Sequence, residues 1–227
     1  MSSRNTAVRP MGATSSRLLP ITGVAAGVVW AGTQIVADLL FVGDPDPVGD
    51  AAGTQQTLLD HQGAAMVTVL GSMYLAVLIV FFAAATRRVL GDSTYASAAF
   101  GGGVLLALAM VSGGIANFAI LSAARHHDTA AITTLGYAES VTWPLLGAAS
   151  GAFLLATGLG ARRAQAMPRW LWVVTVVLGV LALLGPGAFA FWLIAPVWFV
   201  VVGIALDRRG EGVPDQDRRS PSEQAKG

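Results

Sequence analysis

Residues 61–86 read HQGAAMVTVLGSMYLAVLIVFFAAAT and contain no Lys, Arg, Asp or Glu. Two arginines, Arg87 and Arg88, follow this stretch directly. A helix needs about 20 apolar residues to cross a hydrocarbon core of about 30 Å, and this stretch exceeds that length. Inside a bilayer the backbone polar groups must be bonded within the segment itself, which favours a helix. The stretch therefore predicts a membrane-spanning helix that ends at a basic, water-facing boundary.

Further apolar stretches that meet or nearly meet the length of a membrane span precede and follow this one, the fifth being the shortest. Of the 227 residues, 54% are hydrophobic and 12% are charged, which is about half the charged fraction of a typical soluble domain. The six stretches run from Leu18 to Val42, His61 to Thr86, Tyr95 to Ala124, Tyr137 to Ala161, Trp170 to Leu184 and Ala188 to Leu206. We expect an all-α fold, a polytopic bundle of six transmembrane helices over residues 18–206. Polar tails are expected at 1–17 and 207–227.

Basic residues gather on one side of these six spans. Of the 14 lysines and arginines, 13 fall in segments on the same side, and Arg125 falls on the other. Because cytoplasmic segments of membrane proteins are enriched in Lys and Arg, both termini are expected in the cytoplasm. The same alternation places the turn Gly185-Pro186-Gly187 on the outer side. The 13 residues are Arg4, Arg9, Arg17, Arg87, Arg88, Arg162, Arg163, Arg169, Arg208, Arg209, Arg218, Arg219 and Lys226.

The first span carries small and polar residues on one face. Gly23 and Gly27 are followed by Gln34 and Asp38 at steps of seven and four, and residues at these steps share a helix face. A GxxxG pair lets another helix approach closely, whereas a charged group facing lipid is costly. This face is therefore predicted to point into the bundle.

The third and fourth spans repeat this arrangement. The third carries Ala109, Gly113 and Asn117, and the fourth carries Glu139, Trp143, Gly147 and Gly151, at steps of four. At about 1.5 Å per residue, the amides and carboxyl groups of the three spans fall at one level, near the outer edge of the hydrocarbon. Two interpretations are open: packed faces with hydrated helix ends, or an outward-facing vestibule for a cation, proton or small polar ligand. The vestibule candidates are Gln34, Asp38, Asn117 and Glu139.

Histidines and aspartates near the outer ends of the second and third spans offer another candidate site. Imidazole and carboxylate suit zinc, nickel, copper or non-haem iron, and a haem held by His61 and His126 is compatible with the same placement. The sequence has no cysteine, no HExxH motif and no GxSxG motif. We expect solvated loop residues with no bound metal or cofactor, and no residue receives a catalytic assignment. The candidate ligands are Asp60, His61, His126, His127 and Asp128.

Residues 167–171 read Met-Pro-Arg-Trp-Leu and open the fifth span. Together with the six-span plan, the acidic segment after the first span and the Ala/Val/Leu/Gly-rich composition without cysteine, they resemble a group of uncharacterised actinobacterial six-span integral membrane proteins. The resemblance covers Leu18 to Leu206 and implies a bacterial plasma membrane. It carries no activity and no functional residue over to this chain.

Three functions are compatible with these patterns. The first is a non-enzymatic accessory or interaction protein, which binds a membrane-protein partner or a second copy through its small-residue helix faces. The second is a small transporter or channel with the outward-facing vestibule. The third is a membrane metal or haem protein. The lipid bilayer is the expected surrounding in each case, and a net charge of +1 provides no electrostatic basis for binding nucleic acid.

Overall fold

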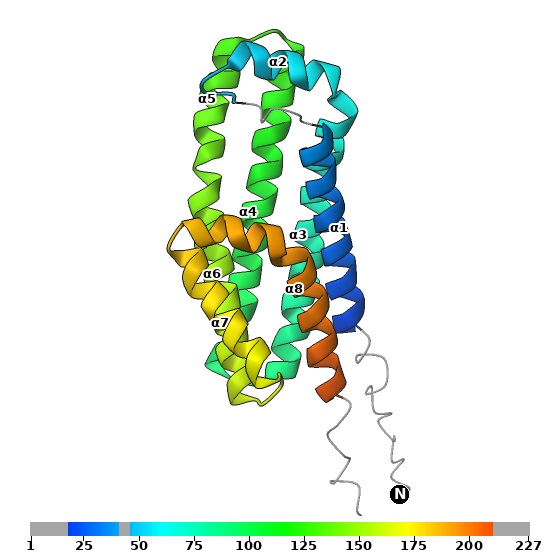
Figure 1. Ribbon diagram of the computed structural model, residues 1–227, viewed down its shortest axis with the longest axis vertical. Coiled ribbons are helices and arrows are strands. Elements are labelled where there is room, and N and C mark those ends of the chain that lie inside the picture. Colours follow the sequence, from blue (N-terminus) through cyan, green and yellow to red (C-terminus); the bar gives the residue numbers. More distant parts are fainter. Residues whose placement is uncertain (1–17, 41–45, 211–227) are drawn as a thin grey trace, which may run out of the picture.

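The computed structural model describes residues 18–40 and 46–210, with side chains at all of these except 38–40, 186, 187, 209 and 210. Every regular element in these residues is a helix, which confirms the predicted all-α fold. The predicted tails lie outside the described residues, apart from 207–210, which continue the last helix. The helices are α1 (Leu18–Leu40), α2 (Ala51–Asp60), α3 (Gln62–Leu90), α4 (Thr94–Arg125), α5 (Thr129–Ser140), α6 (Thr142–Arg163), α7 (Arg169–Leu183) and α8 (Pro186–Gly210) (Figure 1).

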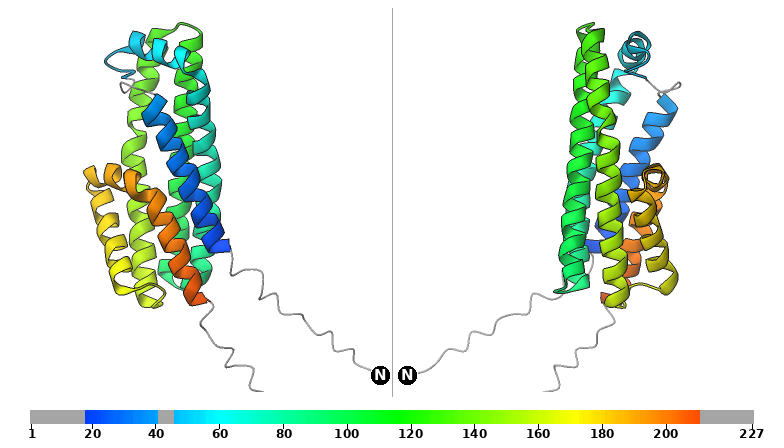
Figure 2. Two further views of the ribbon diagram at one scale, coloured as in Figure 1. Left: turned by 45° about the vertical axis from the view of Figure 1, so that its right-hand side comes forward. Right: turned by 90° about the vertical axis from the view of Figure 1, so that its left-hand side faces the viewer.

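Long helical columns run along the molecule, as Figures 1 and 2 show. α3 packs along α4, and α4 packs against α5 and α6, which follow one another in a single column. α1 packs on α3, and α2 lies across one end of the bundle. α1 begins and α8 ends toward the opposite end. The bundle therefore has one end covered by α2 and a second end that receives both described ends of the chain.

Short acidic side chains start the two helices that the apolar pattern did not predict. Asp50 accepts a hydrogen bond from the Gly53 amide at the start of α2, and Asp128 accepts one from the Ala131 amide at the start of α5. Such caps satisfy amides that have no partner within the first helical turn. Residues 51–60 and 129–136, which lie between predicted spans, are therefore helical, and α5 extends the column of α6 toward α2.

The α7–α8 hairpin reaches only part of the way along the bundle. α7 has 15 residues, or about 22 Å of helix, and its turn at Gly185 (φ 91°) lies near mid-height in Figure 1. A Cβ added at Gly147 of α6 would lie 2.9 Å from the Ala182 carbonyl oxygen and 3.2 Å from Ala188 Cβ. Both arms of the hairpin therefore meet α6 beside Gly147, and the α5–α6 column continues beyond it to Thr129 for about 27 Å. The predicted turn is present, but it does not reach the outer end where the sequence placed it.

Several helices have the length and composition of membrane spans. Within the described residues they are Leu18–Ala37, Gln62–Leu90, Thr94–Arg125, Thr129–Arg163 and Ala188–Arg208. α7 is apolar but shorter than these, and about 30 Å of hydrocarbon requires roughly 20 helical residues. The helices are those of a membrane protein. α7 nearly coincides with the predicted stretch Trp170 to Leu184, and among the described residues the other five predicted spans have the length of a crossing.

α1 and α8 pack backbone to backbone. A Cβ added at Gly23 would lie 2.6 Å from the Phe199 carbonyl oxygen, and one added at Gly27 would lie 2.5 Å from the Pro196 carbonyl oxygen. Only a residue without a Cβ permits such an approach. The GxxxG face of α1 therefore packs inside the molecule, against α8.

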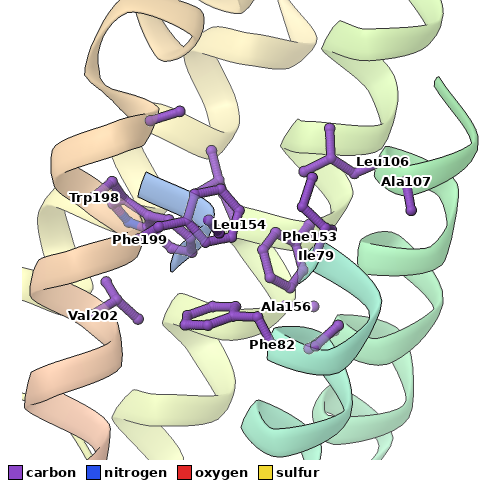
Figure 3. Packing of buried hydrophobic residues seen from close by; sticks show 14 of the residues in the cluster. Ile79, Phe82, Leu106, Ala107, Phe153, Leu154, Ala156, Trp198, Phe199 and Val202 are labelled. Atoms are coloured by element: carbon purple, nitrogen blue, oxygen red, sulfur yellow. The ribbon is translucent and has the colours of Figure 1, made fainter. Parts of the chain in front are cut away.

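Aromatic side chains fill the middle of the bundle. Figure 3 shows Phe82, Phe153, Trp198 and Phe199 lying together, from α3, α6 and α8. The ring centroids of Phe82 and Phe199 are 5.0 Å apart, with the rings edge to face, an arrangement that aromatic pairs prefer. Trp30 of α1 is fully buried, and its ring centroid lies 5.7 Å from that of Phe199. We call these five residues the aromatic cluster.

Candidate functional site

A cavity of about 130 Å³ lies between the aromatic cluster and the end of the bundle that α2 covers. Its walls come from α1, α3, α4 and the α5–α6 column, and Trp192 of α8 contributes to its floor. Each of the helices that form these walls supplies at least one polar side chain. The lining residues with polar or indole groups are Thr33, Gln34, Thr68, Ser72, Asn117, Glu139, Thr142, Trp143 and Trp192.

Gln34 joins α1 to α8 at this floor. Its side-chain Nε2 donates a hydrogen bond to the carbonyl oxygen of Trp192. In a regular helix that carbonyl accepts from the amide four residues later, but Pro196 occupies this position and has no N–H. Gln34 therefore supplies the donor that Pro196 removes. α8 turns in Figure 1 from a course across the bundle to one along α1, and a proline inside a helix is the usual cause of such a bend.

The substitution Gln34→Leu is expected to weaken the contact between α1 and α8. It deprives the Trp192 carbonyl of its donor, and interhelical hydrogen bonds in membrane proteins contribute about 0.6 kcal/mol on average and about 1.7 kcal/mol at most. Unfolding by SDS in dodecylmaltoside micelles measures the loss. In a Pro196→Ala background the amide of residue 196 can serve the carbonyl, so Gln34→Leu should cost less there. Equal costs in both backgrounds would contradict the coupling.

Hydroxyl groups on α1 and α3 are held by their own helices. Thr33 donates to the carbonyl of Val29 at 2.8 Å, and Ser72 donates to the carbonyl of Thr68 at 2.9 Å. Because each hydroxyl hydrogen is already used, the oxygen lone pairs are what remains for a ligand. This part of the wall therefore offers hydrogen-bond acceptors.

Asn117 and Glu139 bring an amide and a carboxyl group to the same cavity. Asn117 Nδ2 donates to the Gly113 carbonyl at 3.0 Å, within α4. Glu139 lies in the last turn of α5, where the column passes through Val141 into α6, and the Thr142 hydroxyl donates to the Glu139 carbonyl at 2.7 Å. None of the residues found to line the cavity is Lys, Arg or His. The lining therefore combines an acidic group with neutral acceptors.

Two indole rings and the aromatic cluster close the cavity toward the middle of the bundle. The ring centroids of Trp143 and Trp192 are 5.9 Å apart, with the rings edge to face. The ring centroid of Trp192 lies 5.0 Å from that of Trp30, which is fully buried. Among the described residues, these packed aromatic side chains form a closed floor to the cavity.

The structure brings three of the four predicted vestibule residues together. Gln34, Asn117 and Glu139 line one cavity from three separate helices. Asp38 belongs to the last turns of α1, and its side chain falls outside the described residues. The three described side chains therefore converge on one cavity, and their depth in a membrane stays a prediction.

Other lining residues were missed by the sequence analysis. Thr68 and Ser72 lie one helical turn apart in an otherwise apolar stretch, and this pair of hydroxyls is the signal that could have found them. Trp192 could not be found in this way, because its contribution depends on the bend of α8.

The candidate metal ligands have other neighbours. Asp128 caps α5, and His126 Nδ1 lies 2.8 Å from the Ser122 carbonyl oxygen in its own helix. Asp60 accepts hydrogen bonds from the Gln56 side chain, His127 Nδ1 pairs with the Gln55 side chain, and His61 is exposed. Within the described residues, no group of three or more His, Cys, Asp or Glu side chains is placed to hold a metal ion.

Comparison with known proteins found no matching family model, no matching curated protein and no matching solved structure.

Proposed function

We propose that this chain is an integral membrane protein whose cavity between α1 and the α5–α6 column binds a small polar ligand. The supporting observation is the convergence of Gln34, Asn117 and Glu139 from three helices on one cavity. Polar and ionisable groups are costly within a membrane, and where they face the interior of a bundle they mark ligand or ion pathways. The closed floor favours the outward-facing binding site of the transporter interpretation over an open channel.

The proposed orientation places this cavity in the outer half of the membrane and both termini in the cytoplasm. Arg87 and Arg88 lie in the last turn of α3, and Arg162 and Arg163 lie in the last turn of α6, at the end of the bundle away from α2. An excess of arginine is typical of the cytoplasmic side. In this proposal α1, α3, α4 and the α5–α6 column cross completely, whereas α7 and α8 enter from the cytoplasmic side and return to it. The resemblance noted above points to a bacterial plasma membrane.

The absence of cysteine makes this topology measurable with single-cysteine variants. In intact cells we expect a membrane-impermeant maleimide to label His126→Cys, and to label Ser220→Cys only after permeabilisation. Leu184→Cys, beside the turn of the hairpin, should stay unlabelled in both cases because a thiol shielded from water does not form the reactive thiolate. Labelling of Ser220→Cys in intact cells would overturn the orientation, and labelling of Leu184→Cys from outside would overturn the returning hairpin.

Filling the cavity should abolish ligand binding. A Cβ added at Gly113, a lining residue, meets nothing within 4 Å, so Gly113→Leu extends into open space. We expect at least one ligand from a panel of small cations, amines and neutral polar molecules to stabilise the wild-type protein in dodecylmaltoside. At about 100 times its Kd the gain is about 2.7 kcal/mol. The thermal unfolding midpoint of Gly113→Leu should not respond.

Gly101→Leu is the matched control. It lies on the same helix, a Cβ added there also meets nothing within 4 Å, and it does not belong to the cavity lining. This variant should respond to the ligand like the wild type. An equal response of Gly113→Leu would move the ligand away from the cavity, and no response of the wild type to any probe would refute the proposed function.

The accessory or interaction function stays a prediction. Of the small-residue faces that motivated it, those of α1 and α6 are already packed inside the molecule. Gly27 packs against the backbone of α8, and a Cβ added at Gly151 of α6 would lie 3.0 Å from the Gly179 carbonyl oxygen of α7. A membrane-protein partner or a second copy would have to use another surface.

A further inference from the structure

The size of the cavity limits what it can enclose. Pockets for drug-sized ligands have volumes of about 300–1,000 Å³, whereas this cavity has about 130 Å³. It can hold a small headgroup. A larger molecule fits only if its remaining part lies outside the cavity.

The lining favours a positively charged headgroup. Trp143 and Trp192 both line the cavity, and their rings meet edge to face with centroids 5.9 Å apart. The π system of Trp attracts cations more strongly than that of any other side chain. Glu139 adds a carboxyl group, and no basic residue was found in the lining.

A metal cation is a poorer match than an organic one. Hard cations such as Ca²⁺ take six to eight oxygen ligands, carboxylates prominent among them. Among the described residues that line the cavity, Glu139 is the only one with a carboxyl group. A carboxyl group combined with indole faces is instead suited to an alkylated ammonium ion. The chemistry of the wall thus points to an ammonium headgroup.

The backbones of α1 and of the α5–α6 column are not packed together beside the cavity within the described residues, and we call this gap in the backbone packing the side opening. In the described residues α1 packs against neither α5 nor α6, and α8 joins α1 to α6 only nearer the other end of the bundle. Trp143, a wall residue, is 40% exposed, and the neighbouring Val141 is 67% exposed. Exposed apolar side chains of this kind face lipid in a membrane protein, so the opening is suited to an alkyl chain.

We propose that the cavity holds the ammonium group of an amphiphilic cation, whose alkyl chain leaves between α1 and α6 into the bilayer. This inference rests on the proposed function and adds the chemical class of the ligand and its route of entry. The shared chemistry is an alkylated ammonium group, which a free ion in water also carries. The experiment must therefore separate a membrane-borne source from a dissolved one.

The test uses a graded series of alkyltrimethylammonium ions, from methyl to octyl, on the full chain in dodecylmaltoside micelles. Octyl sulfate, with the opposite charge and the same chain, is the control for detergent effects. We expect the octyl ammonium ion to raise the thermal unfolding midpoint at a concentration at least tenfold lower than tetramethylammonium. Octyl sulfate should give no such rise. Glu139→Gln should weaken the response at least tenfold, Gly113→Leu should abolish it, and Gly101→Leu should keep it.

Each outcome has a separate meaning. Equal potency of tetramethylammonium and the octyl ion would overturn entry from the bilayer. Stabilisation by neutral polar ligands alone, lost in Gly113→Leu, would overturn the ammonium class and leave the proposed function standing. If Glu139→Gln fails to fold, the loss in Gly113→Leu with retention in Gly101→Leu still tests the site. An octyl-ammonium response that persists in Gly113→Leu would overturn the inference.

Discussion

The substitution Gly27→Leu is expected to prevent α1 from packing against α8 and to leave little folded protein. A Cβ at this position would lie 2.5 Å from the Pro196 carbonyl oxygen and 2.8 Å from Val200 Cγ2. A backbone oxygen cannot move aside unless the helix moves with it. Overpacking typically costs about 1–3 kcal/mol and sometimes more, and the rest of the leucine side chain adds to this clash. The yield of monodisperse protein and the unfolding midpoint in dodecylmaltoside measure the effect.

Gly32→Leu provides the control on the same helix. Gly32 is exposed, and a Cβ added there meets nothing within 4 Å. This variant should fold with the stability of the wild type, and Gly27→Ala should fall between the two leucine variants. Wild-type stability of Gly27→Leu would show that α1 and α8 do not pack through this face.

Phe82→Ala is expected to cost about 3 kcal/mol, the lower end of the range for a buried phenylalanine in soluble proteins. Phe82 is fully buried, and its ring contacts those of Phe153, Trp198 and Phe199. Helices separated in a bilayer still lie among apolar lipid tails, so the transfer of the ring contributes little to the loss. The cost comes from the packing contacts that the cavity removes. Reversible unfolding in SDS and dodecylmaltoside mixtures measures it.

Substitution of the neighbouring Phe81 is the control, because it removes the same ring from an exposed position. Phe81 is 61% exposed, whereas Phe82 is 0% exposed. Phe81→Ala should therefore change the free energy of unfolding by less than about 0.5 kcal/mol, as is usual for exposed positions. Equal losses for the two variants would show that Phe82 does not face the interior of the bundle.

Much of the bundle and part of its cavity follow from patterns that a single helix carries. An uncharged apolar stretch such as 61–86 is long enough to define a helix by itself. The step of four between Gly113 and Asn117 places both residues on one face of α4, and both line the cavity. Counting residues from the basic ends gives depth, so Asn117 and Glu139 could be assigned to one level before their helices were placed.

Features that depend on two helices could not be predicted in this way. The apolar run 170–184 has 15 residues, fewer than the roughly 20 that a full crossing needs, but the place where it turns back, beside Gly147, depends on how it meets α6. The need of the Trp192 carbonyl for a donor can be read from Pro196, but the identity of that donor, Gln34, depends on how α1 meets α8. The side opening has the same origin, because it exists only where α8 does not accompany α1.

Lipid beside the α7–α8 hairpin meets a shorter apolar surface than lipid on the opposite flank. α7 has 15 residues, or about 22 Å of helix, whereas α3 has 29 residues, or about 43 Å. A bilayer relieves such hydrophobic mismatch by local thinning or by helix tilt, at a cost of fractions of a kcal/mol per ångström. With the proposed topology, the surrounding annulus of lipid is therefore asymmetric, thinned on the flank of the hairpin. Acyl-chain length then becomes a variable that acts on one face of this protein more than on the other.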